Sequence, residues 1–370
     1  MRKSLLSLLS IFAVGALSAC NFGSSQGGTP VNVETANTTM MRAMANMSNM
    51  SIGSFEISLE TDSAISMSRD VEENDHGYYD ETGQIIVDGG INFKVSDLWG
   101  TAPKAHLNAT VNEFSVVMSD SDEGEYVNIS LEDDAVNAYY DNEFAYIDLS
   151  GATSLLELMF EGEVPAEFPT KLKAPVGSVD QLEIPDMTDP TNALGSSESD
   201  EMIAQMLPML MLMPNVTATT VGNELRIVYQ LTQADLPDLI ESAILALVSS
   251  MGELPSSLDS SMQAELDAMV AEVLEVIDLT TFRVEVRINT TRNILTYFQI
   301  DVDVELTIED MIWDGYYNEV TYEWVDIEIP FTQVINIDTT TTLQILKFSE
   351  PVTVTFPTDL NTYVNPDEQE

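Results

Sequence analysis

The sequence predicts an α+β fold in which a strongly curved antiparallel sheet, close to a half-barrel, carries helices packed on its concave face. Three observations lead to this prediction. A helical pattern near the start precedes a long series of strand-like runs, apolar helices interrupt that series, and a second series of strands ends the chain. A curved sheet whose apolar face is covered by helices accounts for this order of elements.

Residues 34–50 form the first predicted helix. At about 100° per residue, one side of this helix is almost entirely methionine and alanine, while threonine, arginine and asparagine occupy the other side. The helix is therefore amphipathic, with an apolar face rich in thioethers. The methionines on this face are Met40, Met41, Met44, Met47 and Met50.

The first strand series alternates apolar and polar side chains and is broken by short acidic turns. Leu107 and Val111, for example, point one way and Asn108 the other. Such alternation indicates an antiparallel meander with one buried face. The predicted strands are 52–69, 84–95, 105–119, 126–131, 135–140 and 143–149, and a polar loop is predicted at 181–200.

The second half combines a helical pair with long strands. Asp314 and Gly315 form a two-residue hairpin signal. A shift in apolar phase predicts a β-bulge near Trp324. The predicted elements are an apolar stretch at 202–213, a hairpin of 216–219 and 224–231, helices at 236–251 and 260–277, and strands at 280–289, 294–308, 319–338 and 342–356.

The first twenty residues carry an export signal. Arg2 and Lys3 precede an apolar run that is too short to span a bilayer stably, and the run ends in LSAC at 17–20. This order resembles the lipobox of bacterial lipoproteins. The resemblance implies that residues 1–19 are a signal peptide. It also implies that Cys20 is acylated and anchors the protein to the cell membrane or outer membrane, outside the cytoplasm.

Cys20 is the only cysteine, so this exported chain has no disulfide and depends on its apolar core for stability. The Gly-, Ser- and Thr-rich residues 20–33 predict a flexible tether between the anchor and the folded part. No second apolar stretch reaches the roughly 18 residues of a membrane-spanning helix. The acyl chain is therefore the expected membrane anchor.

The chain is strongly acidic, because 62 Asp and Glu against 13 Lys and Arg give a formal net charge of -49. This charge argues against nucleic acid as a partner. The acids are mostly scattered singly along strands and turns, which is typical of a solvated outer face. A saline habitat or loosely held divalent cations are the alternative explanations.

The sequence shows no G-x-S-x-G elbow, H-E-x-x-H motif, P-loop or glycine-rich dinucleotide turn. His76 and His106 have no cysteine or serine partner at a meaningful spacing. Residues 119–126 faintly resemble a calcium loop, but Leu131 occupies the position that needs a bidentate glutamate, which favours a hairpin turn. We therefore expect no enzyme activity, no cofactor and no metal site, although a hydrolytic carboxylate pair stays open.

Two methionine-rich stretches, 40–50 and 202–213, admit three interpretations. They can be ordinary core packing. They can bind Cu(I), because methionine recurs every third residue from 41 to 50 and thioethers are soft ligands. They can also line a pliable apolar cavity, since unbranched, polarisable methionine suits ligands of varied shape.

Four segments complete the sequence pattern: EFAYIDLSG at 143–151, LRIVYQLTQADL at 225–236, FRVEVRINTTRNILTYFQIDVDVEL at 282–306 and VTVTFPTDL at 352–360. With the order of elements, they resemble the lipoproteins related to the periplasmic lipoprotein carrier and the mycobacterial glycolipid carriers. The resemblance implies one domain over 34–357, an acidic tail at 358–370, and a hydrophobic cavity closed by helices. The implied cavity lining is Met40, Met41, Met44, Met47, Met206, Leu210, Met213, Ile240, Ile244 and Leu247.

The leading hypothesis is a monomeric, non-enzymatic lipoprotein that binds a lipid or another hydrophobic small molecule in this cavity. The alternative is an interaction lipoprotein whose hairpin at 301–336 presents Trp313, Tyr316 and Tyr317 to a protein or glycan. Copper binding by the methionine clusters is the third hypothesis.

Overall fold

The computed structural model describes most of the chain. The described residues are 28–49, 53–72, 78–98, 100–122, 124–160, 162–176, 215–250, 260–318 and 323–366. The predicted signal peptide, the lipidation site Cys20, the polar loop at 181–200 and the apolar stretch at 202–213 lie outside the described residues.

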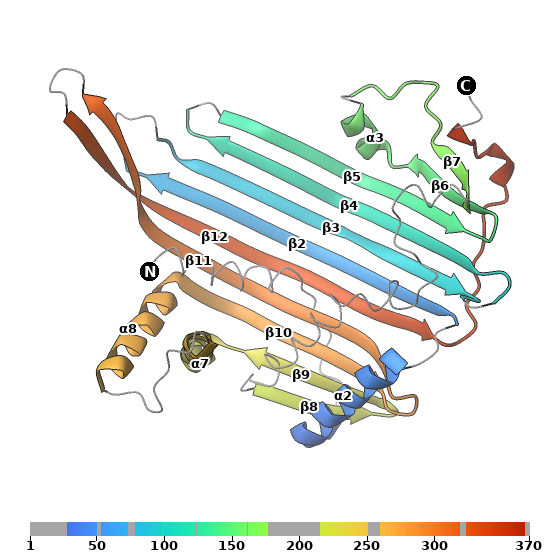
Figure 1. The fold of residues 1–370 in the computed structure, drawn as a ribbon, viewed down its shortest axis with the longest axis horizontal. Helices are drawn as coiled ribbons and strands as arrows, with labels where there is room; N and C mark the ends of the chain where they lie inside the picture. Colours follow the sequence, from blue (N-terminus) through green and yellow to red (C-terminus); the bar gives the residue numbers. More distant parts are fainter. Residues whose placement is uncertain are drawn as a thin grey trace.

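The fold is one open sheet of twelve strands in the order β1-β8-β9-β10-β11-β12-β2-β3-β4-β5-β6-β7 (Figure 1). All neighbouring strands are antiparallel, so the antiparallel sheet predicted from the sequence is confirmed. The strands are β1 (Thr29–Pro30), β2 (Phe55–Val71), β3 (Glu81–Ser96), β4 (Lys104–Asp120), β5 (Gly124–Tyr140), β6 (Phe144–Gly151), β7 (Lys171–Pro175), β8 (Asn215–Val221), β9 (Glu224–Leu231), β10 (Ile277–Asn289), β11 (Ile294–Asn318) and β12 (Glu323–Phe348).

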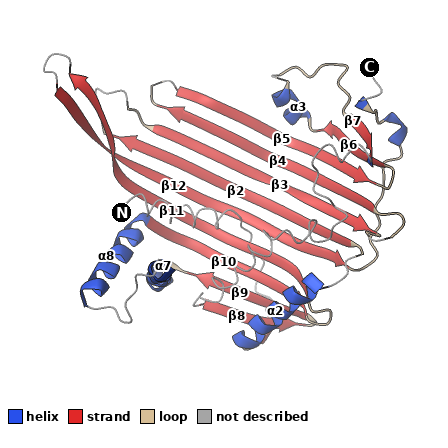
Figure 2. Cartoon of the chain, viewed as in Figure 1, coloured by secondary structure: helices blue, strands red, loops and turns tan. Residues whose placement is uncertain are grey.

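Helices are few beside this sheet (Figure 2). Three of them pack on strands β8 to β11, and a fourth packs on β5 near the opposite edge. The helices are α2 (Val33–Asn49), α7 (Leu236–Ser250) and α8 (Ser260–Val276) on the first group of strands, and α3 (Thr153–Met159) on β5.

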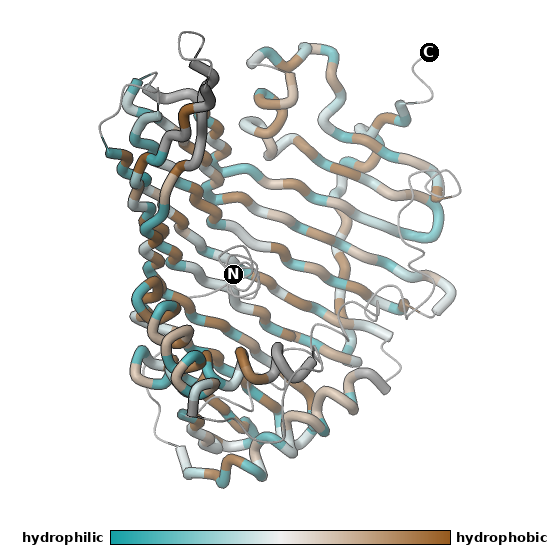
Figure 3. The backbone as a smooth tube through the Cα atoms, turned by 60° about the vertical axis from the view of Figure 1, so that its left-hand side comes forward, coloured by the Kyte–Doolittle hydropathy of each residue, from teal (hydrophilic) through white to brown (hydrophobic). Residues whose placement is uncertain are grey.

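The helices α2, α7 and α8 share one face of the sheet. The core beneath α2 and the core beneath α7 and α8 both include Phe282 and Val304, whose side chains therefore point to the same side. We call this side the helix face and the opposite side the outer face. Hydropathy alternates along the strands in Figure 3, as a two-sided sheet requires.

The long hairpin of β11 and β12 differs from the sequence prediction at two points. Asp314 pairs with Ile327 and Gly315 with Asp326, so the predicted turn at Asp314-Gly315 is wrong. The predicted bulge near Trp324 is also wrong, because the pairing passes this residue without a register shift. A local turn preference is small beside the gain from continuous pairing of two long strands.

Residues on both sides of 34–357 contact the sheet. Residues 29–31, expected in the tether, pair with β8 through β1 and through the N–H of Val31. In the expected acidic tail, Val364 bridges to Leu172 of β7 and Asp359 accepts a hydrogen bond from Lys171 at 2.7 Å. A basic partner on β7 attracts this acidic segment, which the tail's composition alone does not show.

The outer face of β9, β10 and β11 carries an ion cluster centred on Glu285. This side chain is 2% exposed and accepts hydrogen bonds from Arg226 at 2.6 Å, from Arg287 at 2.7 Å and from Arg283. Burial alone would raise the pKa of Glu285, but the hydrogen bonds and the positive charges of Arg226 and Arg287 together outweigh burial and lower it. Three of the 13 basic residues of the chain thus hold one carboxylate.

Further along the outer face, carboxylates oppose one another across strands. Asp62 pairs with Asp88, and Asp303 pairs with Asp338. Burial and the neighbouring negative charges raise the pKa values of Asp62 and Asp303. This face therefore concentrates negative charge at some cost in stability.

Glu285→Gln tests the ion cluster. The variant leaves three guanidinium groups without their buried carboxylate, so we expect the free energy of unfolding to fall by about 3 kcal/mol in urea denaturation. Glu305→Gln, which removes an exposed acid from β11, is the matched control and should change little. Equal effects of the two substitutions would contradict a structural role for the cluster.

Asp62→Asn tests the carboxylate repulsion. The folded-state pKa of Asp62 is raised, so stability falls as pH rises from its ordinary value through the folded value. Removing the charge should stabilise the protein by about 0.5 kcal/mol at pH 7, and the gain should vanish in acid, where the wild-type group is protonated. Thermal unfolding at several pH values measures this, with the exposed turn variant Asp122→Asn as control. A gain that persists unchanged in acid would refute the explanation.

Candidate functional site

Five of the ten sequence-predicted lining residues fall into three clusters. Met40 and Met44 pack over β8 to β11, and Met47 packs beside Phe55 of β2. Ile240 and Ile244 of α7 pack with α8. Met41 is 48% exposed. Met206, Leu210, Met213 and the side chain of Leu247 lie outside the described residues.

Helix α2 is fixed to the sheet near its middle by a buried tyrosine. The Tyr229 hydroxyl donates to Asn37 Oδ1 at 2.7 Å and contacts Met40 Sδ at 3.6 Å. Tyr229 is fully buried, and burial raises its pKa to about 12, so the hydroxyl stays protonated and continues to donate. With Ala36 and Ala43 also fully buried, this part of the methionine face is closely packed core.

A second attachment holds the C-terminal part of α2. Asn46 Nδ2 donates to the carbonyl of Asn293 at 3.0 Å, and the N–H of Leu295 donates to Met47 Sδ at 3.2 Å. The sulfur atom of Met40 thus contacts Tyr229, and that of Met47 contacts the backbone of Leu295 in another apolar cluster. The described part of α2 does not bring these two thioethers to one point.

The pair α7 and α8 forms the next covered area of the helix face. Ile240 and Ile244 are both 6% exposed and pack with Leu266 and Val270 of α8. Gln233 Nε2 donates to the carbonyl of Ile277 at 2.9 Å, and its Oε1 accepts the N–H of Leu279 at 2.7 Å. These bonds tie the start of α7 to the start of β10, so the described part of this helical pair also covers a filled core.

Between these helices and α3, the helix face continues over strands β12, β2, β3, β4 and β5. The strand register places apolar side chains in rows that cross these strands. Most of these side chains are only half-buried. One row is Ile337, Ile65, Ile85, Val116 and Ile129, and the next is Ile335, Met67, Gly83, Met118 and Val127.

Gly83 leaves a gap in the second row. A Cβ at this position would lie 3.6 Å from Met67 Cε and 3.9 Å from Met118 Cγ, which is ordinary van der Waals contact. The two flexible methionine side chains therefore flank a position with no side chain of its own. Methionine adapts readily to the shape of what it contacts, so this is the most pliable part of the rows.

Hydroxyl groups interrupt the apolar rows on one side. Thr339 and Ser63 are buried and hydrogen-bonded to each other, and Thr341 donates to Thr61 at 3.0 Å. These four groups satisfy one another in pairs across β12 and β2. Buried hydroxyls in pairs avoid the cost of unsatisfied polar groups on an apolar surface.

The far boundary of the rows is α3. Asp134 lies in register with Val111 and Gly89, and its carboxylate accepts the N–H of Ser154 at 3.0 Å and of Leu155 at 2.7 Å. The carboxylate thereby satisfies free N–H groups in the first turn of α3. The apolar rows thus run between α3 at one side of the helix face and α2, α7 and α8 at the other.

A polar row closes the apolar rows at one end. Arg69, Glu81 and Asp120 follow Met67, Gly83 and Met118 in the same strands, and Arg69 Nη2 pairs with Glu81 at 2.5 Å. The Nε of Arg69 is buried and has no hydrogen-bond partner among the described residues. The apolar surface is therefore bounded by charge.

The apolar rows were not among the sequence-predicted site residues. The prediction assigned the lining to helices because their methionine content was conspicuous. The alternation in β2 to β5 indicates which side chains form the rows, because every second side chain of a strand lies on the same face. Which strands lie side by side, however, follows from the pairing of β12 with β2.

Comparisons with known proteins name no family. No family model matches the chain, and a search of curated proteins found no match. Among solved structures, the outer membrane protease OmpT of Escherichia coli has 6% sequence identity and a TM-score of 0.15, with 80% of this chain and 98% of that chain covered. A β-barrel-like protein of a domain of unknown function from Brucella abortus has 9% identity and a TM-score of 0.15, with 78% and 98% covered. TM-scores of this size do not show a shared fold.

Two further observations concern the described residues alone. None of their helices is both long and apolar enough to cross a membrane. No group of three or more His, Cys, Asp or Glu side chains within the described ranges is placed to hold a metal ion.

Met40→Ala and Met41→Ala form a matched test of the α2 contact. Met40 is 2% exposed and Met41 is 48% exposed, although they are neighbours in one helix. Truncating Met40 should lower the free energy of unfolding by about 3 kcal/mol, whereas truncating Met41 should change it by less than about 0.5 kcal/mol. Urea denaturation gives both values, and similar losses for the two variants would contradict the packing described.

Proposed function

We propose that the protein is a non-enzymatic, membrane-anchored bacterial lipoprotein that binds a lipid or another hydrophobic molecule on the helix face. The site is the set of apolar rows on β12, β2, β3, β4 and β5, and the helix face is the concave side of the sheet. The observation that supports this proposal is a broad, half-buried apolar surface bounded by helices on two sides. The ligand class that fits such a surface is an acyl chain.

The energetic argument rests on apolar area. Soluble proteins rarely leave a large contiguous apolar surface in water, and such surfaces usually mark a binding site. Each square ångström that a ligand covers contributes about 25 cal/mol, less the cost of ordering the ligand. Ile91, which continues the apolar face of β3, is 41% exposed, so area is available for covering.

The membrane anchor belongs to the same proposal. The lipobox at 17–20 supports acylation of Cys20, and the tether that follows would keep the folded part near a bilayer. A site for acyl chains and a membrane anchor suit each other, because the membrane is the source of such ligands. The acidic outer face would turn away from anionic lipid headgroups.

Gly83→Trp and Gln84→Trp test the site with adjacent substitutions on opposite faces of β3. The indole at 83 would cover the apolar rows, whereas the indole at 84 would lie on the outer face. We expect Gly83→Trp to weaken binding of a fluorescent fatty acid at least about tenfold, which corresponds to about 1.4 kcal/mol, and Gln84→Trp to leave it unchanged. Circular dichroism would confirm that both variants fold.

Mass spectrometry of organic extracts from the purified protein completes this test. A lipid recovered from the wild type and from Gln84→Trp, but not from Gly83→Trp, would support the proposal. Equal binding by all three proteins, or no binding by any, would refute it.

A second candidate function is an interaction role for the hairpin of β11 and β12. The specific observation in its favour is that this hairpin extends past both neighbouring strands (Figure 1). The side chains of Trp313, Tyr316 and Tyr317, which suggested this role in the sequence, lie outside the described residues.

A further inference from the structure

The hairpin of β11 and β12 leaves the sheet as a two-stranded ribbon. Pairing with β10 ends at Leu306, and pairing with β2 ends at Phe331. Residues 311–318 of β11 and 323–330 of β12 therefore pair only with each other among the described strands. The ribbon projects from one corner of the molecule in Figure 1, where a partner can reach it.

The ribbon and its root carry negative charge only. Residues 307–332 contain no lysine, arginine or histidine. This stretch contains seven acids, Glu309, Asp310, Asp314, Glu319, Glu323, Asp326 and Glu328. A surface with charge of one sign attracts partners of the opposite sign and repels copies of itself.

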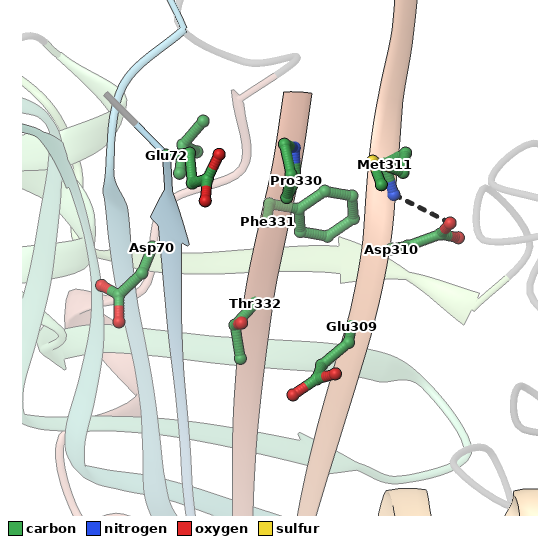
Figure 4. A pocket seen from close by; sticks show the side chains of 9 residues that line it. Asp70, Glu72, Glu309, Asp310, Met311, Pro330, Phe331 and Thr332 are labelled. Atoms are coloured by element: carbon green, nitrogen blue, oxygen red, sulfur yellow. Dashed lines mark hydrogen bonds between the residues drawn. The ribbon is translucent and has the colours of Figure 1, made fainter. Parts of the chain in front are cut away.

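A groove lies at the root of the ribbon, on the outer face. Its floor is Pro330 and Thr332 of β12 (Figure 4). Asp70 of β2 and Glu72, which follows β2, form one wall, and Glu309 of β11 forms the other. Met311 adds an apolar contact to the second wall. The hollow has a volume of about 550 Å³, and Val71, Asp310 and Phe331 complete its lining.

The width of the groove selects a polypeptide over a single metal ion. The two walls stand two strand spacings apart, which is about 9.5 Å. A calcium ion needs oxygen ligands at about 2.4 Å, so one ion cannot contact both walls. An extended chain with alternating long cationic side chains can contact both walls. The aliphatic stems of these side chains pack on the floor, and their charged ends reach the carboxylates.

A second copy of this chain is a poor occupant. Each copy has a net charge of -49, and the segment that would meet the groove would be acidic almost anywhere on its surface. A basic segment is attracted by the same negative charges that repel a second copy of the chain. Charge complementarity therefore favours one class of occupant.

We propose that the groove at the root of the ribbon is a docking site for an extended, lysine- or arginine-rich segment of a partner polypeptide. The basic side chains pair with Asp70 and Glu309, and their stems lie on Pro330 and Met311. The site is separate from the apolar rows, because it lies on the outer face. The partner that this site fits is a basic polypeptide segment.

Fluorescence anisotropy with a labelled peptide tests the proposal on the purified protein. The probe is a peptide of about ten residues that alternates lysine and valine, and its counterpart alternates glutamate and valine. We expect the lysine peptide to bind, the glutamate peptide not to bind, and the affinity for the lysine peptide to fall as salt rises. The double variant Asp70→Asn, Glu309→Gln should bind the lysine peptide about tenfold more weakly.

Two controls separate this groove from the general acidity of the protein. Glu113→Gln with Asp122→Asn removes two exposed acids elsewhere and should leave the affinity unchanged. Thr332→Trp keeps the charge but fills the groove, and should weaken binding as much as the charge variant. Equal losses in the two charge variants, full binding by Thr332→Trp, or no binding by the wild type would each overturn the proposal.

Discussion

The register of the long strands is the constraint on which the rest of this structure depends. Successive side chains of a strand point to opposite faces, so a slip of one residue would move every apolar side chain to the wrong side. The pairing of β12 with β2 joins the second meander to the first and aligns Ile337 with Ile65 and Thr339 with Ser63. The apolar rows, the paired hydroxyls and the outer carboxylates all follow from this alignment.

The two faces of the sheet carry different kinds of side chain, apolar on the helix face and charged on the outer face. The helix face has to bury apolar area, which α2, α7 and α8 do over β8 to β11 through closely packed cores. The outer face has to hold charge, and it does so by pairing Glu285 with three arginines while leaving Asp62 and Asp303 beside other acids. The apolar cores stabilise the fold, whereas the opposed carboxylates of the outer face weaken it slightly while keeping the surface strongly hydrated. A binding site for an apolar ligand on one face and for a basic segment on the other is consistent with this division.

Much of the fold follows from the sequence because alternation and helical periodicity are local. The helices at 33–49 and 236–250 and the strands β2, β3, β4 and β10 were predicted close to their observed ranges. The strands β5 and β12 were each predicted as two shorter strands, and β11 was predicted to end at 308. The short helix α3 and strand β7 were missed, since Asp134 and the C-terminal segment that hold them are distant in sequence. The turn at Asp314-Gly315 was wrong because pairing of β11 with β12 overrides a local signal. The candidate site could be predicted as apolar but not located, because its rows exist only once strands from both halves of the chain are paired.

Photo-crosslinking with a diazirine-bearing fatty acid would test the central claim most directly. The probe would be incubated with the purified protein, irradiated, and located by peptide mass spectrometry. The account predicts labels on helix-face residues such as Ile65, Ile85 and Val116, and their loss in the presence of excess unlabelled fatty acid. Labels confined to the outer face, or labels that excess fatty acid does not displace, would contradict the assignment of the apolar rows as a binding site.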